Sequence, residues 1–105
     1  MRRQTKATNI SPKVKETVAR RDGGRCIICG RYGAPNAHYI SRAQGGLGIE
    51  ENIVTLCDTC HRVYDQTEAR EDYRATIRQY LQSKYPKWDE KKLKYRKYSF
   101  LEEKV

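Results

Sequence analysis

The chain of 105 residues has no long hydrophobic run, and its aliphatic content is modest. It therefore lacks the pattern of a signal peptide or a membrane-spanning helix, and we expect a soluble cytoplasmic protein with no membrane partner. It also has no internal repeat and no low-complexity tract. A single domain of this length builds only a small hydrophobic core, so a structural metal ion would add stability that burial alone does not supply.

The net charge of +9 is unevenly distributed. Residues 1–25 carry 8 basic and 2 acidic side chains, residues 26–65 carry 3 and 4, and residues 66–105 carry 11 and 7. Basic flanks around a slightly acidic centre suit a polyanion such as DNA or RNA, whose phosphates they would contact. Lysine-rich helices that only keep a small protein soluble would give the same totals, so charge alone leaves both interpretations open.

All four cysteines lie in two Cys-x2-Cys pairs, Cys26 with Cys29 and Cys57 with Cys60. In a reducing compartment, two such pairs are typical of one tetrahedral zinc site rather than of disulfides. Buried free thiols are the alternative. The pattern predicts a structural Zn²⁺.

The segments before this site show helix signals after a polar start. We expect residues 1–10 to form a flexible basic arm. Ser11 is a suitable N-cap with Pro12 in the first helical position, and Gly23 and Gly24 would end the helix.

Two short strands and a helix are expected in the centre. A strand over residues 36–41 would place His38 on the face opposite Ala37 and Tyr39. A second strand, residues 53–56, would lead into the second cysteine pair. Asp58 is a suitable cap for the helix that follows.

After residue 66 the chain has helical periodicity. The apolar positions Tyr73, Ile77, Tyr80 and Leu81 would face the core of one helix that ends before Pro86. Trp88 is expected to anchor the chain. Residues 89–98 are expected to form a basic terminal helix with Asp89 as N-cap.

The central stretch resembles the HNH endonuclease family, in the variant whose ββα-metal hairpin is braced by a four-cysteine zinc site. The resemblance is carried by His38, the Gly45-Gly46 pair seven residues later, and the run NIVTLCDTCH from Asn52 to His61. It implies a small α+β fold with a treble-clef-like ββα-metal core over residues 26–65. Residues 1–105 would then be one nuclease domain, with residues 66–105 as a helical basic extension.

The resemblance also implies roles for individual residues. His38 would be the general base that activates water against a DNA phosphodiester. His61 and Asp65 would hold a catalytic divalent ion, for which Mg²⁺, Mn²⁺, Ni²⁺ and Zn²⁺ are all candidates. Asn52 would either orient the histidine through its loop or complete the metal shell.

One position departs from the family pattern. Counting back from the glycine pair makes His38 the base and puts Ala37 where a metal ligand is usual. An alternative register makes His38 the ligand and leaves Tyr39 at the position of the base, but it breaks the spacing to the glycines. We therefore keep the first register.

For DNA binding we expect contributions from Arg42 and from the basic C-terminal residues Lys91, Lys92, Lys94 and Lys97. Small HNH proteins are common in bacteriophages and prophages, so the resemblance implies a bacterial host cell.

Three functions compete. The first is a metal-dependent HNH DNA endonuclease. The second is a zinc-stapled DNA-binding module in which the missing ligand at Ala37 has silenced cleavage. The third is a zinc module that binds phage packaging proteins during assembly.

Overall fold

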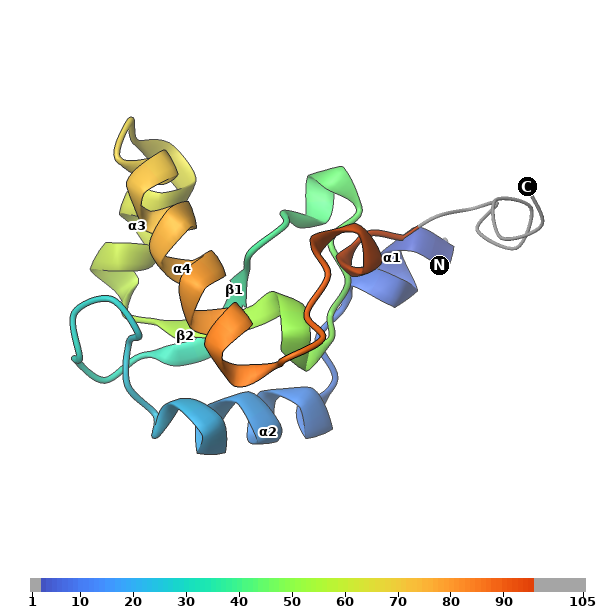
Figure 1. Ribbon diagram of the computed structural model, residues 1–105, viewed down its shortest axis with the longest axis horizontal. Coiled ribbons are helices and arrows are strands. Elements are labelled where there is room, and N and C mark those ends of the chain that lie inside the picture. The colour runs from blue at the N-terminus through green and yellow to red at the C-terminus, as the bar shows by residue number, and fades with distance from the viewer. Residues whose placement is uncertain (1–2, 96–105) are drawn as a thin grey trace.

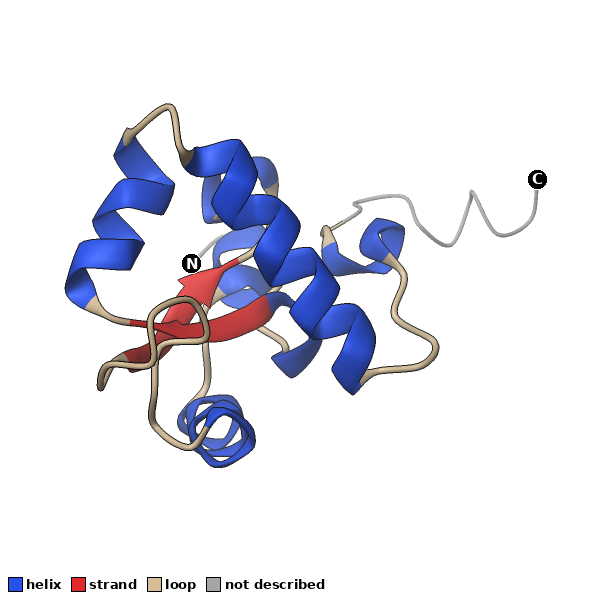
Figure 2. Cartoon of the chain, turned by 60° about the vertical axis from the view of Figure 1, so that its left-hand side comes forward, coloured by secondary structure: helices blue, strands red, loops and turns tan. Residues whose placement is uncertain are grey.

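The computed structural model describes residues 3–95, which form a small α+β fold around a two-stranded antiparallel sheet (Figure 1). Helix α2 covers one face of the sheet, and helices α3 and α4 cover the other face (Figure 2). This arrangement confirms the predicted fold class. The elements in chain order are α1 (Arg3–Thr8), α2 (Pro12–Asp22), β1 (Ala34–His38), β2 (Ile53–Leu56), α3 (Asp58–Gln66) and α4 (Arg70–Lys84), with 3-10 turns at Arg42–Gln44, Glu50–Asn52 and Glu90–Leu93.

Strand β1 begins and ends earlier than the sequence pattern predicts. His38 pairs with Ile53 and is the last residue of the strand. Beyond it, the Tyr39 N–H donates to the Asn52 carbonyl at 2.8 Å, and the Ile40 N–H donates to the Asn52 side-chain oxygen at 2.9 Å. Because the Asn52 side chain takes the place of the backbone group that would continue the strand pairing, the chain leaves the sheet. The prediction for β2 is confirmed.

Helix α2 has the predicted ends. The Ser11 side chain accepts a hydrogen bond from the Val14 N–H at 3.2 Å, with Pro12 in the first turn. At the other end Gly23 is in the left-handed region, with φ of 67°. Val18 is fully buried, so one face of the helix packs on the sheet.

The core lies between the sheet and α4. The predicted stripe is confirmed, since Ile77 and Leu81 are fully buried and the two tyrosines of the stripe pack at its edge. After the helix ends, the Trp88 ring packs edge-on against Tyr39, with ring centroids 5.6 Å apart. Its indole N–H donates to the Glu51 carbonyl at 2.8 Å, so the tryptophan is the expected anchor.

Two expectations about the ends of the chain were wrong. Residues 3–8, part of the expected flexible arm, form helix α1, which is fastened by a 3.0 Å hydrogen bond from the Gly48 N–H to the Ala7 carbonyl. The expected helix over residues 89–98 is only a 3-10 turn, capped by Asp89. It cannot continue because the Leu93 carbonyl and the Tyr95 N–H bond to the loop at residues 45–47, each at 2.7 Å. Residues 96–98 lie outside the described part of the chain.

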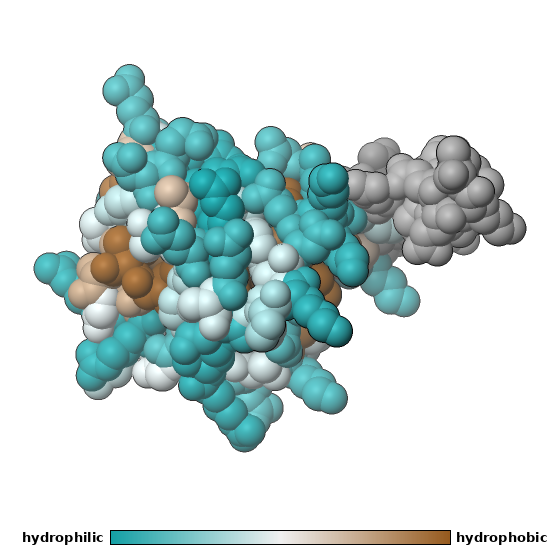
Figure 3. Space-filling view, viewed as in Figure 1, coloured by the Kyte–Doolittle hydropathy of each residue, from teal (hydrophilic) through white to brown (hydrophobic). Residues whose placement is uncertain are grey.

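Within residues 3–95, no helix has the length and apolar character needed to cross a membrane. The face seen in Figure 3 is covered mostly by hydrophilic side chains.

Candidate functional site

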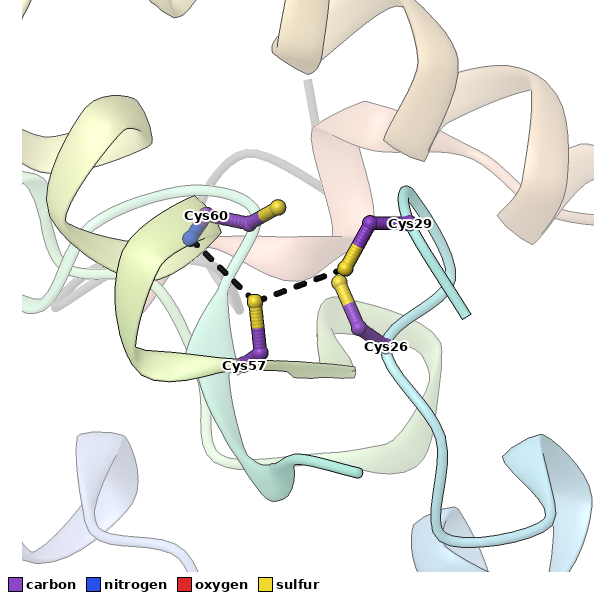
Figure 4. A group of neighbouring side chains, drawn as sticks. All are labelled: Cys26, Cys29, Cys57 and Cys60. Atoms are coloured by element: carbon purple, nitrogen blue, oxygen red, sulfur yellow. Dashed lines mark hydrogen bonds between the residues drawn. The ribbon is translucent and has the colours of Figure 1, made fainter. Parts of the chain in front are cut away.

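The four cysteines converge on one point (Figure 4). Cys26 and Cys29 lie in the loop after α2, Cys57 follows β2, and Cys60 is in the first turn of α3. Their four sulfur atoms all lie within 4.8 Å of one another. A tetrahedral zinc with Zn–S bonds of about 2.3 Å places its sulfurs about 3.8 Å apart, so this set suits Zn²⁺.

The backbone around these sulfurs is arranged to hold thiolates. Cys57, not the expected Asp58, is the N-cap of α3, and its sulfur accepts from the Cys60 N–H at 3.4 Å. The turn in the first pair is closed by a 2.9 Å bond from the Gly30 N–H to the Cys26 carbonyl, with Gly30 at φ of 82°. That conformation is one that glycine adopts without strain.

Hydrogen bonding shifts the pKa values of two of the thiols in opposite directions. Burial raises the pKa of Cys26, but backbone N–H donors from Cys29, Cys57 and Ile28 outweigh it and lower that pKa to about 7. Burial raises the pKa of Cys60, and hydrogen bonds to the neighbouring sulfurs raise it further. The easily deprotonated Cys26 favours metal binding, because the thiolate is the ligand form.

A second group of predicted residues meets in a cleft of about 690 Å³ on another part of the surface. Its walls include four residues of the predicted site: His38, Arg42, His61 and Asp65. They come from the end of β1, the loop after it and one face of α3. The structure thus brings these four together, while their chemical roles stay predictions.

His38 is partly buried in this cleft. Its Nε2 lies 2.9 Å from the carbonyl oxygen of Thr8, the last residue of α1. Burial lowers the pKa of His38, and the nearby Arg42 and His61 lower it further, against the raising effect of the Thr8 carbonyl. A lowered pKa favours the neutral imidazole, the form that accepts a proton.

His61 and Asp65 lie one turn apart on α3. The distance from His61 Nε2 to the Asp65 carboxylate is 3.4 Å, and the two side chains are 31% and 56% exposed. Two ligands of one ion, each at about 2.1 Å, lie about 3.0–3.4 Å apart. The distance is compatible with a shared divalent ion as well as with a direct ion pair. Among the described residues, the only group of three or more Cys, His, Asp or Glu side chains placed for one metal is the cysteine cluster.

Asn52 does not reach the cleft. Its side chain is fully buried and holds the loop after His38, accepting from the Ile40 N–H and donating to the Ile40 carbonyl at 3.2 Å and the Leu47 carbonyl at 2.8 Å. This geometry agrees with the loop-holding role that the resemblance implies. It does not agree with a place in a metal shell, since all three bonds go to backbone.

Ala37 is also fully buried, in a strand pair with Val54. The side chain at position 37 is part of the core, so it supplies nothing to the cleft.

The expected DNA-binding residues lie in different places. Arg42 lines the cleft, but Lys91 and Lys94 line a separate hollow with Gln44, while Lys92 lines a third pocket that Trp88 also lines. Lys97 lies outside the described residues.

Sequence reasoning missed part of the cleft. Lys15 and Arg70 also line it, from α2 and α4. The only signal for them was the excess of basic residues in both flanks. The Thr8 carbonyl was missed too, because a backbone group leaves no mark in the sequence.

Comparison with known proteins agrees with this geometry. The family model described as HNH endonuclease matches residues 26–66. The protein named Anaredoxin, from Nostoc sp. (strain PCC 7120 / SAG 25.82 / UTEX 2576), is 29% identical over 62 residues, which are 57% of this chain and 82% of that protein. The matched segment contains both strands, helix α3 and the four cysteines, so residues 26–66 match the HNH endonuclease family in the region where the sequence motifs predicted the resemblance.

Proposed function

We propose that the protein is a metal-dependent DNA endonuclease of HNH type that hydrolyses phosphodiester bonds. The observation that carries the proposal is the meeting of His38 with His61 and Asp65 in one cleft. A neutral imidazole and a pair of donors for a divalent ion are what phosphodiester hydrolysis needs. The match to the HNH endonuclease model supports the same reaction class.

In the proposed reaction, His38 takes a proton from a water molecule as the water oxygen forms a bond to phosphorus. The bond from phosphorus to one sugar oxygen then breaks, and that oxygen takes a proton from solvent. A divalent ion bound to His61 and Asp65 would stabilise the charge on the phosphate and the departing oxygen. The guanidinium of Arg42, at the same cleft, would contact the phosphate and position it.

The cysteine cluster has a structural role in this proposal. A Zn²⁺ bound there would tie the loop after α2 to the start of α3, the helix that carries His61 and Asp65. One such site cuts one strand at a time, so a double-strand break requires a second copy or a second encounter. We infer a bacterial cytoplasmic setting and a phage or prophage origin from the family resemblance, with phage packaging proteins as the corresponding partners.

The second candidate is a DNA-binding module without catalysis. The observation in its favour is Ala37, which is buried in the core and leaves His61 and Asp65 as a pair of ligands rather than a larger set. Such a module would bind DNA through the same basic residues and would not cut it.

A plasmid-nicking assay separates the two. The zinc-loaded protein is incubated with supercoiled DNA and Mg²⁺, Mn²⁺ or Ni²⁺, beside His38→Ala and the exposed control Gln79→Ala. The nuclease proposal expects nicking by the wild type and by Gln79→Ala. His38→Ala should cut about 10² to 10⁴ times more slowly, with unchanged zinc content and DNA affinity. Full activity of His38→Ala would refute the mechanism, and a wild type inert with every metal would favour the binding module.

A further inference from the structure

Helix α1 lies outside the family-matched segment, yet it is attached to the loop that follows His38. The Gly48 N–H donates to the Ala7 carbonyl at 3.0 Å, and the Arg42 side chain donates to the Asn9 side-chain oxygen. Thr8, the last residue of the helix, is buried, with 2% of its surface exposed. The two residues that follow the helix, Asn9 and Ile10, line the cleft.

We propose that this N-terminal segment is a positioning element for His38, acting through the carbonyl of Thr8. The inference rests on the proposed function, in which His38 is the base. A carbonyl oxygen only accepts hydrogen bonds, so the contact of 2.9 Å requires a proton on Nε2 of the neutral imidazole. The lone pair is then on Nδ1, which becomes the atom that takes the proton from water.

His38 needs such a partner because of its place in the fold. It is the last residue of β1, and the chain turns away from the sheet directly after it. The strand pairing fixes the backbone of His38, but the orientation of its imidazole ring depends on contacts with residues outside the strand. Thr8, 30 positions earlier, supplies that contact and selects one tautomer. A base in the wrong tautomer presents a proton where a lone pair is needed.

Gly48 offers a way to disturb this contact without changing a cleft side chain. A Cβ atom added there would lie 2.0 Å from the Asn9 carbonyl oxygen and 2.6 Å from its carbon. Both are backbone atoms, so the segment itself must move. Gly48→Ala should therefore shift the neighbouring Thr8 carbonyl away from His38.

The experiment reads the tautomer directly. Long-range ¹H–¹⁵N NMR spectra of the zinc-loaded full chain are recorded near neutral pH for the wild type, for Gly48→Ala and for Gly23→Ala. Gly23 has a left-handed backbone, with φ of 67°, so an alanine there is strained, but nothing lies within 4 Å of its Cβ position. Gly23→Ala therefore controls for reduced stability alone. We expect His38 as the Nε2–H tautomer in the wild type and in Gly23→Ala, and a mixture of tautomers in Gly48→Ala. Plasmid nicking should fall about 10²-fold in Gly48→Ala only.

A second variant covers the case in which Gly48→Ala does not fold. Because residue 26 is a cysteine, residues 1–25 can be made synthetically and joined by native chemical ligation. Replacing the Thr8–Asn9 amide by an ester makes the Thr8 carbonyl a poorer acceptor and changes no side chain. We expect the same mixture of tautomers.

An Nδ1–H tautomer in the wild type would overturn the inference, as would a tautomer unaffected by either change. Faster nicking in the altered proteins would also overturn the inference, because the N-terminal segment would then inhibit cleavage rather than position His38 for it. Since the spectra do not depend on cleavage, an inert wild type with the Nε2–H tautomer would refute the proposed function and leave the contact to Thr8 established.

Discussion

The Arg21 side chain and the Asp22 carboxylate, adjacent at the end of α2, form an ion pair of 2.7 Å in which the aspartate side chain is fully buried. Asp22 also accepts from the Tyr80 hydroxyl and from the Thr55 N–H. The arginine in turn donates to the Ile53 carbonyl at 2.7 Å. The pair therefore joins α2 to both β2 and α4, the elements that enclose the core.

We expect Asp22→Asn to lower the free energy of unfolding by about 3 kcal/mol, since removing one charge of a buried pair leaves the other uncompensated. The matched control is Glu16→Gln, whose partner Arg20 is exposed, and it should cost under about 1 kcal/mol. Urea unfolding of the zinc-saturated proteins measures both. Equal effects of the two changes would contradict the structural role of the buried pair.

The same carboxylate predicts an acid dependence of stability. Burial raises the pKa of Asp22, but the hydrogen bonds from Arg21 and Tyr80 outweigh it, so the folded pKa lies below the ordinary value. A lowered folded pKa gives stability that is fully present above the unfolded pKa of about 3.9 and is lost as the pH falls through the folded pKa. Asp22→Asn should flatten this acid limb of the unfolding free energy. If the unfolding free energy of Asp22→Asn still fell at acid pH as it does in the wild type, the acid dependence would come from other groups.

Zinc removal should unfold the protein. The cysteine pairs are far apart in sequence and the core is small, so the ion closes a loop that little else holds. Elemental analysis should find one zinc per chain, and chelation should abolish the native circular dichroism. Cys57→Ser should behave like the chelated protein, while Thr59→Ala, an exposed change in the same turn, should bind zinc normally. A native spectrum that survives complete chelation would contradict this.

Asn52→Ala should loosen the loop that follows His38. The change leaves the Ile40 N–H and carbonyl and the Leu47 carbonyl without their partner, and each buried group that loses its hydrogen bond costs about 1–3 kcal/mol. Asn36→Ala, an exposed asparagine at the cleft, should change the unfolding free energy by less than about 0.5 kcal/mol. Equal stability of the two variants in urea unfolding would show that the loop does not depend on Asn52.

His61→Ala should impair cleavage in a different way from His38→Ala. If His61 and Asp65 hold the catalytic ion, removing one ligand raises the metal concentration needed for half-maximal nicking, and excess metal partly restores the rate. Removal of the base leaves a deficit that metal cannot repair. Titration of both variants with Mn²⁺ tests this, and restoration of His38→Ala by metal would reverse the two assignments.

The basic C-terminal residues should contribute to DNA affinity more than to cleavage. Replacing Lys91, Lys92, Lys94 and Lys97 by glutamine should flatten the dependence of affinity on salt, by about 0.9 in slope for each DNA phosphate that these lysines no longer neutralise. Since Lys91 and Lys94 lie outside the His38 cleft, the nicking rate at saturating DNA should stay unchanged. Arg42→Gln is the comparison, and it should lower that rate. An unchanged salt slope would show that the C-terminal lysines face away from DNA.

The sequence by itself determined the parts of this protein that depend on local patterns. The spacing of Cys26, Cys29, Cys57 and Cys60 predicts the metal cluster, since two Cys-x2-Cys turns present their sulfurs in one geometry wherever they meet. Helix α2 was equally predictable, because Ser11, Pro12 and Gly23 act on backbone groups within one turn of themselves. The stripe of α4 follows from helical periodicity.

Tertiary contacts decided the rest. Residues 3–8 are held as a helix against a loop some 40 positions later in the chain. The Leu93 carbonyl and the Tyr95 N–H form hydrogen bonds with the loop at residues 45–47 instead of extending a helix. Local propensity cannot report such partners, because each contact joins backbone groups that carry no sequence signature. For the same reason, nothing in the sequence indicated that the Thr8 carbonyl would contact His38. His38 was identifiable from its spacing to the glycines, but only the folded chain placed against its ring the hydrogen-bond acceptor that sets its tautomer.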